Sequence, residues 1–251
     1  MLRVLLLTIS VISVIPIAVT GQTSYANAAL EEGYRLVETG KALNAMPTSG
    51  KRPEDFVPRH WKVFAKADGD LNRNGINDAV LILQLDPEDR SYLASLPGGK
   101  DATWSAGAYM IVTLLDKPNK TLEFDEVNYS IGAIPQNPRD QLTLEIKNGV
   151  VSVYSSTGGT LRFDETYRFR EDPPTGGFLT LIGYDFEEYS VANEPERVHY
   201  TLSENYLTGE RVETTTRFDK RGNEIGGQPK KSVFKPEKTG FSEVRPKARN
   251  Y

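Results

Sequence analysis

Oxygen-bearing side chains recur at alternate positions of one short segment, the pattern expected of a cation-binding loop. They belong to Asp70, Asn72, Asn74 and Asp78. Calcium prefers about six to eight oxygen ligands, and alternate positions of a tight loop can direct their oxygens inward. Gly75 lets the chain reverse where a Cβ atom would clash, and Ile76 can contribute its backbone carbonyl. The segment therefore predicts a calcium loop.

The flanking residues predict that this loop joins two β-strands. Residues 61–67 alternate between apolar and polar side chains, and residues 79–85 form an apolar run broken only by Gln84. An EF-hand would instead need flanking helices and a bidentate glutamate at the twelfth loop position, which is Leu81 here. The loop is thus expected between a half-buried strand and a fully buried one.

The strand–loop–strand segment resembles the calcium loop of FG-GAP/VCBS-type repeats, over roughly Trp61 to Leu85. The ligands that this resemblance implies are Asp70, Asn72, Asn74, the carbonyl of Ile76, and Asp78. Such loops usually carry aspartate at the position of Asn74, so the departure implies weaker binding. A caged ion of this kind implies a structural role. The alternative is a metal-free turn, because Asn, Asp and Gly form tight turns unaided.

More broadly, the chain resembles a family of uncharacterised bacterial exported β-rich proteins that carry one such loop near the start. The likeness rests on the segments Lys147–Val150, Thr166–Arg170, Leu181–Tyr184 and Asn205–Gly209. It covers most of the chain after the leader. It implies export and brings no known activity.

Side chains that commonly carry catalysis are few or poorly placed. The chain has no cysteine and two histidines, His60 and His199, neither with a partner at metal-ligand spacing. The acidic pairs Asp125-Glu126 and Glu187-Glu188 are neighbours on predicted strands, so their two carboxylates face opposite sides. No catalytic residue is predicted, which favours a non-enzymatic protein.

Residues 1–28 have the composition of a secretory signal peptide. Arg3 supplies a short positive region, Val4–Val19 is an almost unbroken apolar run, and Ala26-Asn27-Ala28 suits cleavage after Ala28. The apolar run is short for a bilayer span. We therefore expect a periplasmic or secreted protein with no membrane span after cleavage. The alternative is an uncleaved N-terminal anchor.

Hydrophobic periodicity predicts a mainly β protein, either an antiparallel meander sheet or a small sandwich, with a short N-terminal helix. The helix is expected over Ala29–Thr39, ending at Gly40, and a Pro/Gly loop follows to Asp55. Residues 56–218 are expected to form the β-rich domain, which includes the calcium-type loop at 68–78. No helical pattern separates the predicted strands, so parallel crossover units are not expected.

Asn148-Gly149 is the clearest local signal. This dipeptide suits a type I′ turn, in which both central residues need positive φ. A two-residue turn sets Lys147 opposite Val150 and Ile146 opposite Val151. The turn and the apolar pattern therefore predict the same hairpin register.

The charge distribution predicts a basic, loose tail at residues 219–251. This stretch holds nine Lys or Arg against four acidic residues, while the whole chain carries a formal net charge of −4. That overall charge does not favour nucleic acid as a partner. The tail is expected to be solvated; the alternative is a weak contact with anionic envelope material.

Two aromatic residues are candidates for contact with a partner. Trp104 stands in the Gly/Ala/Ser-rich segment 98–107, and Tyr206 stands in the predicted turn Glu204–Gly209. The sequence thus favours an exported binding protein, inhibitor- or immunity-like towards a protein in the envelope. The alternatives are a carboxylate-dependent hydrolase of envelope polymers and a structural envelope protein.

Overall fold

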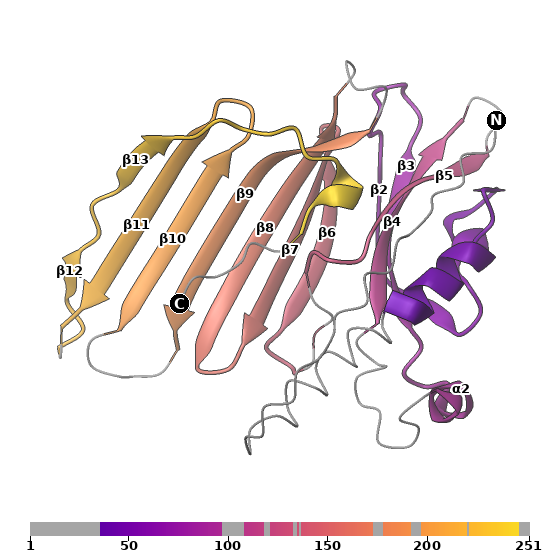
Figure 1. Cartoon of the computed structure of the whole chain (residues 1–251), viewed down its shortest axis with the longest axis horizontal. Coiled ribbons are helices and arrows are strands. Elements are labelled where there is room, and N and C mark those ends of the chain that lie inside the picture. The colour runs from indigo at the N-terminus through magenta and orange to yellow at the C-terminus, as the bar shows by residue number, and fades with distance from the viewer. Residues whose placement is uncertain are drawn as a thin grey trace, which may run out of the picture.

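The computed structural model describes residues 36–96, 108–117, 121–132, 135, 137–172, 178–191, 197–219 and 221–245. Within these residues the chain is mainly β, with two antiparallel sheets and a short helix near the N-terminus (Figure 1). The predicted fold class is confirmed. None of the described helices has the length and apolar composition needed to cross a bilayer. The predicted signal peptide, residues 1–28, lies outside the described residues.

The first sheet has five strands in the order β1-β5-β4-β3-β2. Its strands are β1 (Ser49–Gly50), β2 (Trp61–Gly69), β3 (Asp78–Leu85), β4 (Tyr109–Asp116) and β5 (Leu122–Asn128). Every residue of β3 is buried, as its continuous apolar run predicts. The candidate loop therefore joins an edge strand, β2, to a buried inner strand.

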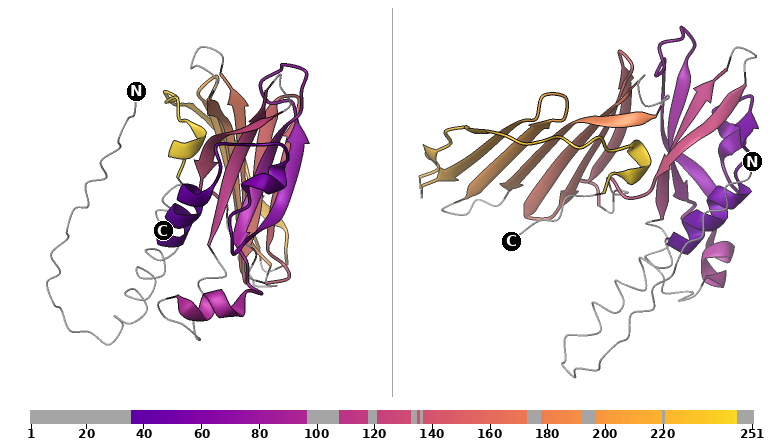
Figure 2. Two further views of the ribbon diagram at one scale, coloured as in Figure 1. Left: turned by 90° about the vertical axis from the view of Figure 1, so that its right-hand side faces the viewer. Right: turned by 45° about the horizontal axis from the view of Figure 1, so that its top comes forward.

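Helical segments cover one face of this sheet (Figure 2). They are the helix of residues 36–45, the 3-10 helix η1 (Pro53–Phe56) and α2 (Arg90–Ser95). The first helix differs from expectation because it continues past Gly40. Ala42 is 4% exposed and packs in the same cluster as Leu81 and Leu83. This burial outweighs the weak helix propensity of glycine.

The second sheet has eight strands and follows the chain as a meander. Its order is β12-β11-β10-β9-β8-β7-β6, and β13 also pairs with β11. The strands are β6 (Gln141–Lys147), β7 (Val150–Gly158), β8 (Leu161–Glu171), β9 (Leu179–Ser190), β10 (Val198–Asn205), β11 (Glu210–Phe218), β12 (Glu224–Gly226) and β13 (Lys230–Val233). Successive strands are hydrogen-bonded neighbours, so side chains far along the chain meet on one surface.

The Asn148-Gly149 hairpin forms with the predicted register. Lys147 pairs with Val150 and Ile146 with Val151. Asn148 and Gly149 have φ angles of 55° and 73°, as a type I′ turn requires.

The two sheets meet where β2 lies beside β6. A Cβ atom on Gly69 would lie 2.5 Å from Cγ2 of Ile146, so the absence of a side chain allows this close approach. One apolar cluster spans the junction and includes Val80 and Ile111 of the first sheet and Val153 and Phe169 of the second.

The expectation of a loose tail does not hold for residues 221–245. These residues form β12, β13 and the 3-10 helix η5 (Phe241–Glu243). Phe241 is fully buried and meets the ring of Phe169 edge-on at 5.0 Å. The Asn128 amide donates to the carbonyls of Phe241 and Val244. Local composition suggested solvation, but long-range contacts fix the segment.

Candidate functional site

The side-chain oxygens of the candidate calcium loop bind the loop's own backbone. Asp70 accepts hydrogen bonds from the amides of Asn74, at 3.0 Å, and Gly75, at 2.8 Å. Asn72 Oδ1 also accepts from the Asn74 amide, and Asn74 Oδ1 accepts from the Ile76 amide at 2.7 Å. The contacts of Asn72 and Asn74 are Asx turns, and the longer-range contacts of Asp70 close the loop around them.

Asp78 lies beneath this loop as a buried brace. Its carboxylate accepts from the amides of Leu71 and Asp116, both at 2.7 Å, and from the more distant amide of Asn72. Asp78 is 1% exposed, and burial raises the pKa of its carboxyl. The residue therefore ties the loop to the end of β4, which the sequence did not predict.

The donor set of the loop fits a hard cation. All five predicted ligands are oxygens, and a carboxylate or amide oxygen that accepts one hydrogen bond keeps a second lone pair. The surroundings are acidic: burial, followed by the charges of Asp125, Asp78 and Asp70, raises the pKa of Glu171. Asp116 Oδ1 is buried and has no donor among the described residues. Calcium, if bound, would be coordinated by Asp70, Asn72 and Asn74 and would stabilise the loop.

No three His, Asp or Glu side chains come together as a metal site within the described part of the chain. Of the five predicted loop ligands, only Asp70 and Asp78 are acidic side chains, so the loop does not form a cluster of three. Calcium binding by the loop thus stays a prediction.

A second candidate site lies on the eight-stranded sheet, on the surface we call the polar face. Side chains alternate along these strands: Tyr167 and Phe186 are buried in the core, whereas their neighbours Thr166 and Asp185 are partly exposed. Antiparallel pairing sets the exposed side chains next to one another across β7 to β10. The polar face comprises Tyr154, Asp164, Thr166, Asp185, Glu187, Thr201 and Ser203.

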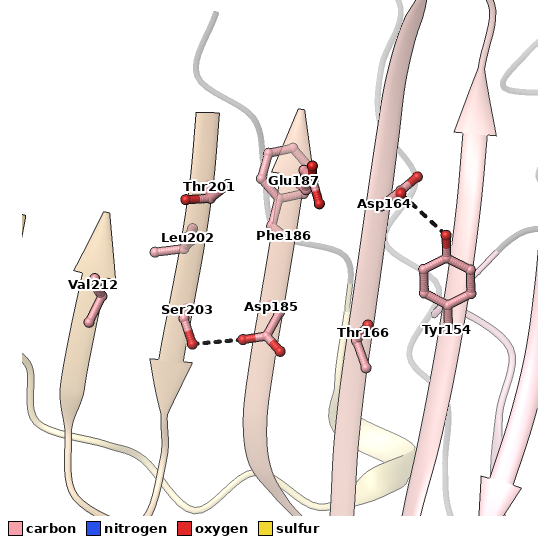
Figure 3. A pocket seen from close by; sticks show the side chains of 10 residues that line it. All are labelled: Tyr154, Asp164, Thr166, Asp185, Phe186, Glu187, Thr201, Leu202, Ser203 and Val212. Carbon is pink, nitrogen blue, oxygen red and sulfur yellow. Dashed lines mark hydrogen bonds between the residues drawn. The ribbon is translucent and has the colours of Figure 1, made fainter. Parts of the chain in front are cut away.

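These seven residues line a hollow of about 370 Å³, shown in Figure 3. Ser203 donates to Asp185 at 2.7 Å, and Arg168 pairs with the other oxygen of that carboxylate at 2.5 Å. Glu187 contacts Nε2 of His199 at 2.7 Å. Phe186, Leu202 and Val212 complete the lining, so the hydroxyl and carboxylate acceptors of the hollow stand beside apolar side chains.

Asp164 differs from the other two carboxylates of the polar face. Its Oδ2 accepts from the phenols of Tyr154, at 3.2 Å, and Tyr189, at 3.5 Å. Its Oδ1 is buried and finds no donor among the residues that the structure describes. Asp164 also lies directly opposite Glu187 on the next strand. Among the described residues, the hydrogen-bond partners of this carboxylate are two neutral phenols.

The two histidines lie apart from each other and from the loop. His60, with a positive φ of 68°, contacts Asp89 through Nδ1 at 2.6 Å and stacks on Tyr92 at 3.8 Å. The hydrogen bond from His60 lowers the pKa of Asp89 to about 2. These contacts join α2 to the start of β2. His199 lies on the polar face side of β10.

The predicted partner contacts have different outcomes. Trp104 lies outside the described residues. Tyr206 is engaged within the molecule, because its hydroxyl donates to Glu204 and its ring meets Phe234 edge-on at 5.3 Å. Leu207, in the same turn, is 57% exposed. Tyr206 thus helps to hold the C-terminal segment.

Sequence reasoning missed the polar face because it compared carboxylates along one strand only. Glu187 and Glu188 do face opposite sides, but Glu187 pairs with Asp164 across β8 and β9. Aligning the two strands of that predicted hairpin would have brought Asp164 and Glu187 together.

Comparison of the chain with protein-family models, with curated proteins and with solved structures finds no match.

Proposed function

We propose that this protein is an exported binding protein, and that it recognises a protein partner in the envelope through the polar face of its eight-stranded sheet. The observation that carries the proposal is the hollow of about 370 Å³ that crosses β7 to β11 on that face. Seven of its ten lining residues carry hydroxyl or carboxylate groups and are at least partly exposed. An exposed polar hollow on a rigid sheet is a preorganised recognition surface.

The rest of the molecule supports a scaffold role. Loop 70–78 is proposed as a structural calcium site that braces the β2–β3 connection, because its side-chain oxygens and Asp78 are already fixed by backbone amides. The leader-like composition of residues 1–28 supports export. An inhibitor- or immunity-like action would follow if the partner were an envelope hydrolase or a toxic effector.

The test compares two variants that carry the same substitution on opposite faces. Thr201→Tyr places a bulky ring in the hollow, whereas Thr215→Tyr adds it to the opposite face of the neighbouring strand, at an exposed position. Immobilised exported wild-type protein and both variants are incubated with envelope extract. We expect one protein to be retained by wild type and Thr215→Tyr and lost by Thr201→Tyr. Equal retention by all three, or none by wild type, contradicts the proposal.

One observation favours a second candidate function, a carboxylate-dependent hydrolase of envelope polymers. Asp164 and Glu187 are directly opposed across β8 and β9 and line the same hollow. Opposed residues have Cβ atoms about 4.5–5.5 Å apart, so both carboxyl groups lie on one side of the sheet, as a two-carboxylate glycosidase mechanism needs. New reducing ends released from purified envelope polymer by wild type, and absent with Glu187→Gln, would establish hydrolysis. Their absence with wild type removes this candidate.

A further inference from the structure

The charges of the polar face are unevenly balanced. Asp185 pairs with the permanently charged guanidinium of Arg168, and Glu187 contacts the ring of His199. Asp164 is hydrogen-bonded by two phenols, which carry no positive charge. Within the described part of the chain, the carboxylate of Asp164 is therefore left without a positively charged partner.

The basic residue two positions along β8 cannot serve Asp164, because it is committed elsewhere. Arg162 is 4% exposed and pairs with Asp140 at 3.3 Å. Its guanidinium also donates to the carbonyls of Gly158 and Arg139 and to Ser156 Oγ. Arg162 thus holds the ends of the neighbouring strands together, and among the described residues its guanidinium forms no ion pair with Asp164.

The Asp164 carboxylate has no charged donor among the described residues. A buried carboxylate oxygen without a hydrogen bond is costly, and a charged donor satisfies it better than a neutral one. Burial raises the pKa of Tyr154, so this phenol remains a donor that keeps Oδ2 occupied. The opposed carboxylates of Asp164 and Glu187 also repel each other. A cation between them would relieve that repulsion.

We propose that the hollow of the polar face receives a lysine or arginine side chain from an extended segment of the protein partner, with Asp164 as its main counter-charge. This inference rests on the proposed binding function and names the chemistry of the partner. Charge complementarity selects a cationic group. The hydroxyls of Thr166, Thr201 and Ser203 continue across β8 and β10 beside the carboxylates and would hydrogen-bond the rest of the segment.

The probe for this proposal is a fluorescent octalysine peptide, with the same peptide fully acetylated at its lysine side chains as the neutral control. Fluorescence anisotropy with the exported protein is measured at low and at physiological salt. We expect wild type to bind octalysine, with affinity that weakens as salt rises, and to leave the acetylated peptide unbound.

Matched variants separate the hollow from the general negative charge of the protein. Asp164→Asn removes the proposed counter-charge, while Glu88→Gln removes one charge from a side chain that is 87% exposed and lies outside the polar face. We expect Asp164→Asn to weaken octalysine binding about tenfold or more, and Glu88→Gln to change it less than about twofold. Equal losses in the two variants would overturn the proposal, as would failure of wild type to bind.

Thr201→Tyr provides a second route if Asp164→Asn does not fold. It fills the hollow and keeps every charge, so it should weaken octalysine binding, whereas Thr215→Tyr should not. Unchanged binding by Thr201→Tyr would place the peptide elsewhere and overturn the proposal. The capture experiment with envelope extract distinguishes failure of this inference from failure of the binding function. Loss of a partner from Thr201→Tyr, together with no octalysine binding by wild type, keeps the binding function and overturns the cationic partner.

Discussion

At the scale of single residues, Asp78 is a candidate metal ligand that also stabilises the folded chain. Its carboxylate satisfies amides from the loop and from the end of β4 while lying almost fully buried. We expect Asp78→Ala to lower the free energy of unfolding by about 2–4 kcal/mol, because buried amides lose their acceptor. Urea unfolding in chelator measures this, with Asn77→Ala, at an exposed neighbouring position, as the control. Equal stability of the two variants would contradict a stabilising role for the Asp78 carboxylate.

Asn74 decides how strongly the loop would hold calcium. Asn74→Asp adds a third charged ligand and should increase the rise in melting temperature caused by calcium. Asn77→Asp adds the same charge at a position outside the predicted ligand set and should have a smaller effect. Thermal unfolding in excess calcium and in chelator compares the two variants with wild type. If calcium shifts none of the three melting temperatures, the loop is an Asx turn that needs no ion.

The buried carboxyl group of Glu126 should make the free energy of unfolding depend on pH. It is 7% exposed, and its carboxylate accepts from the amides of Leu179 and Ser242. Burial, opposed by those hydrogen bonds, raises the pKa of Glu126 above its usual 4.5. The folded state then holds this proton more tightly than the unfolded chain. The stability contributed by the protonated group is therefore lost as pH rises through the raised pKa.

Glu126→Gln should remove this part of the pH dependence. We expect the unfolding free energy of wild type to fall more steeply than that of Glu126→Gln as pH rises above 4.5, the usual pKa of the group. Glu123→Gln, on the same strand with its side chain 50% exposed, should keep the wild-type slope. Urea unfolding at several pH values gives the three slopes, and identical slopes would rule out a raised pKa at Glu126.

At the scale of elements, the C-terminal segment of residues 221–245 packs against the apolar core through Phe241. Phe241→Ala should lower the unfolding free energy by about 3–5 kcal/mol, because it removes a fully buried ring that packs on Phe169. Val233→Ala, at a side chain that is 82% exposed, should cost less than about 0.5 kcal/mol. Chemical denaturation of both variants measures the difference. A small effect of Phe241→Ala would restore the interpretation of this segment as a loose tail.

Elements set by local chemistry could be predicted from the sequence, whereas those set by distant contacts could not. The Asn148-Gly149 turn and the apolar pattern beside it determine one register, and the hairpin has that register. The segment around Phe241 is polar and basic along the chain, and its order depends on Asn128 and Phe169, which are far away in sequence. The polar face likewise exists only when Asp164 and Glu187 meet across two strands.

At the scale of the whole molecule, the two sheets have different surroundings. The five-stranded sheet packs against helical segments on one face and joins the shared apolar cluster on the other. The eight-stranded sheet contributes one face to that cluster and keeps partly exposed polar side chains on the other. The two apolar clusters lie on the first sheet and on one face of the second, and the proposed recognition uses the other, polar face of the second sheet.

The most direct test of the proposed recognition is site-specific photo-crosslinking in intact cells that produce the protein. A benzophenone amino acid is placed either at Thr143, opposite Tyr154 at the rim of the polar face, or at Thr215 on the opposite face; both are exposed strand positions. We predict a defined protein adduct from position 143 and none from position 215. An adduct from position 215 alone, or none from either position, would contradict recognition through the polar face.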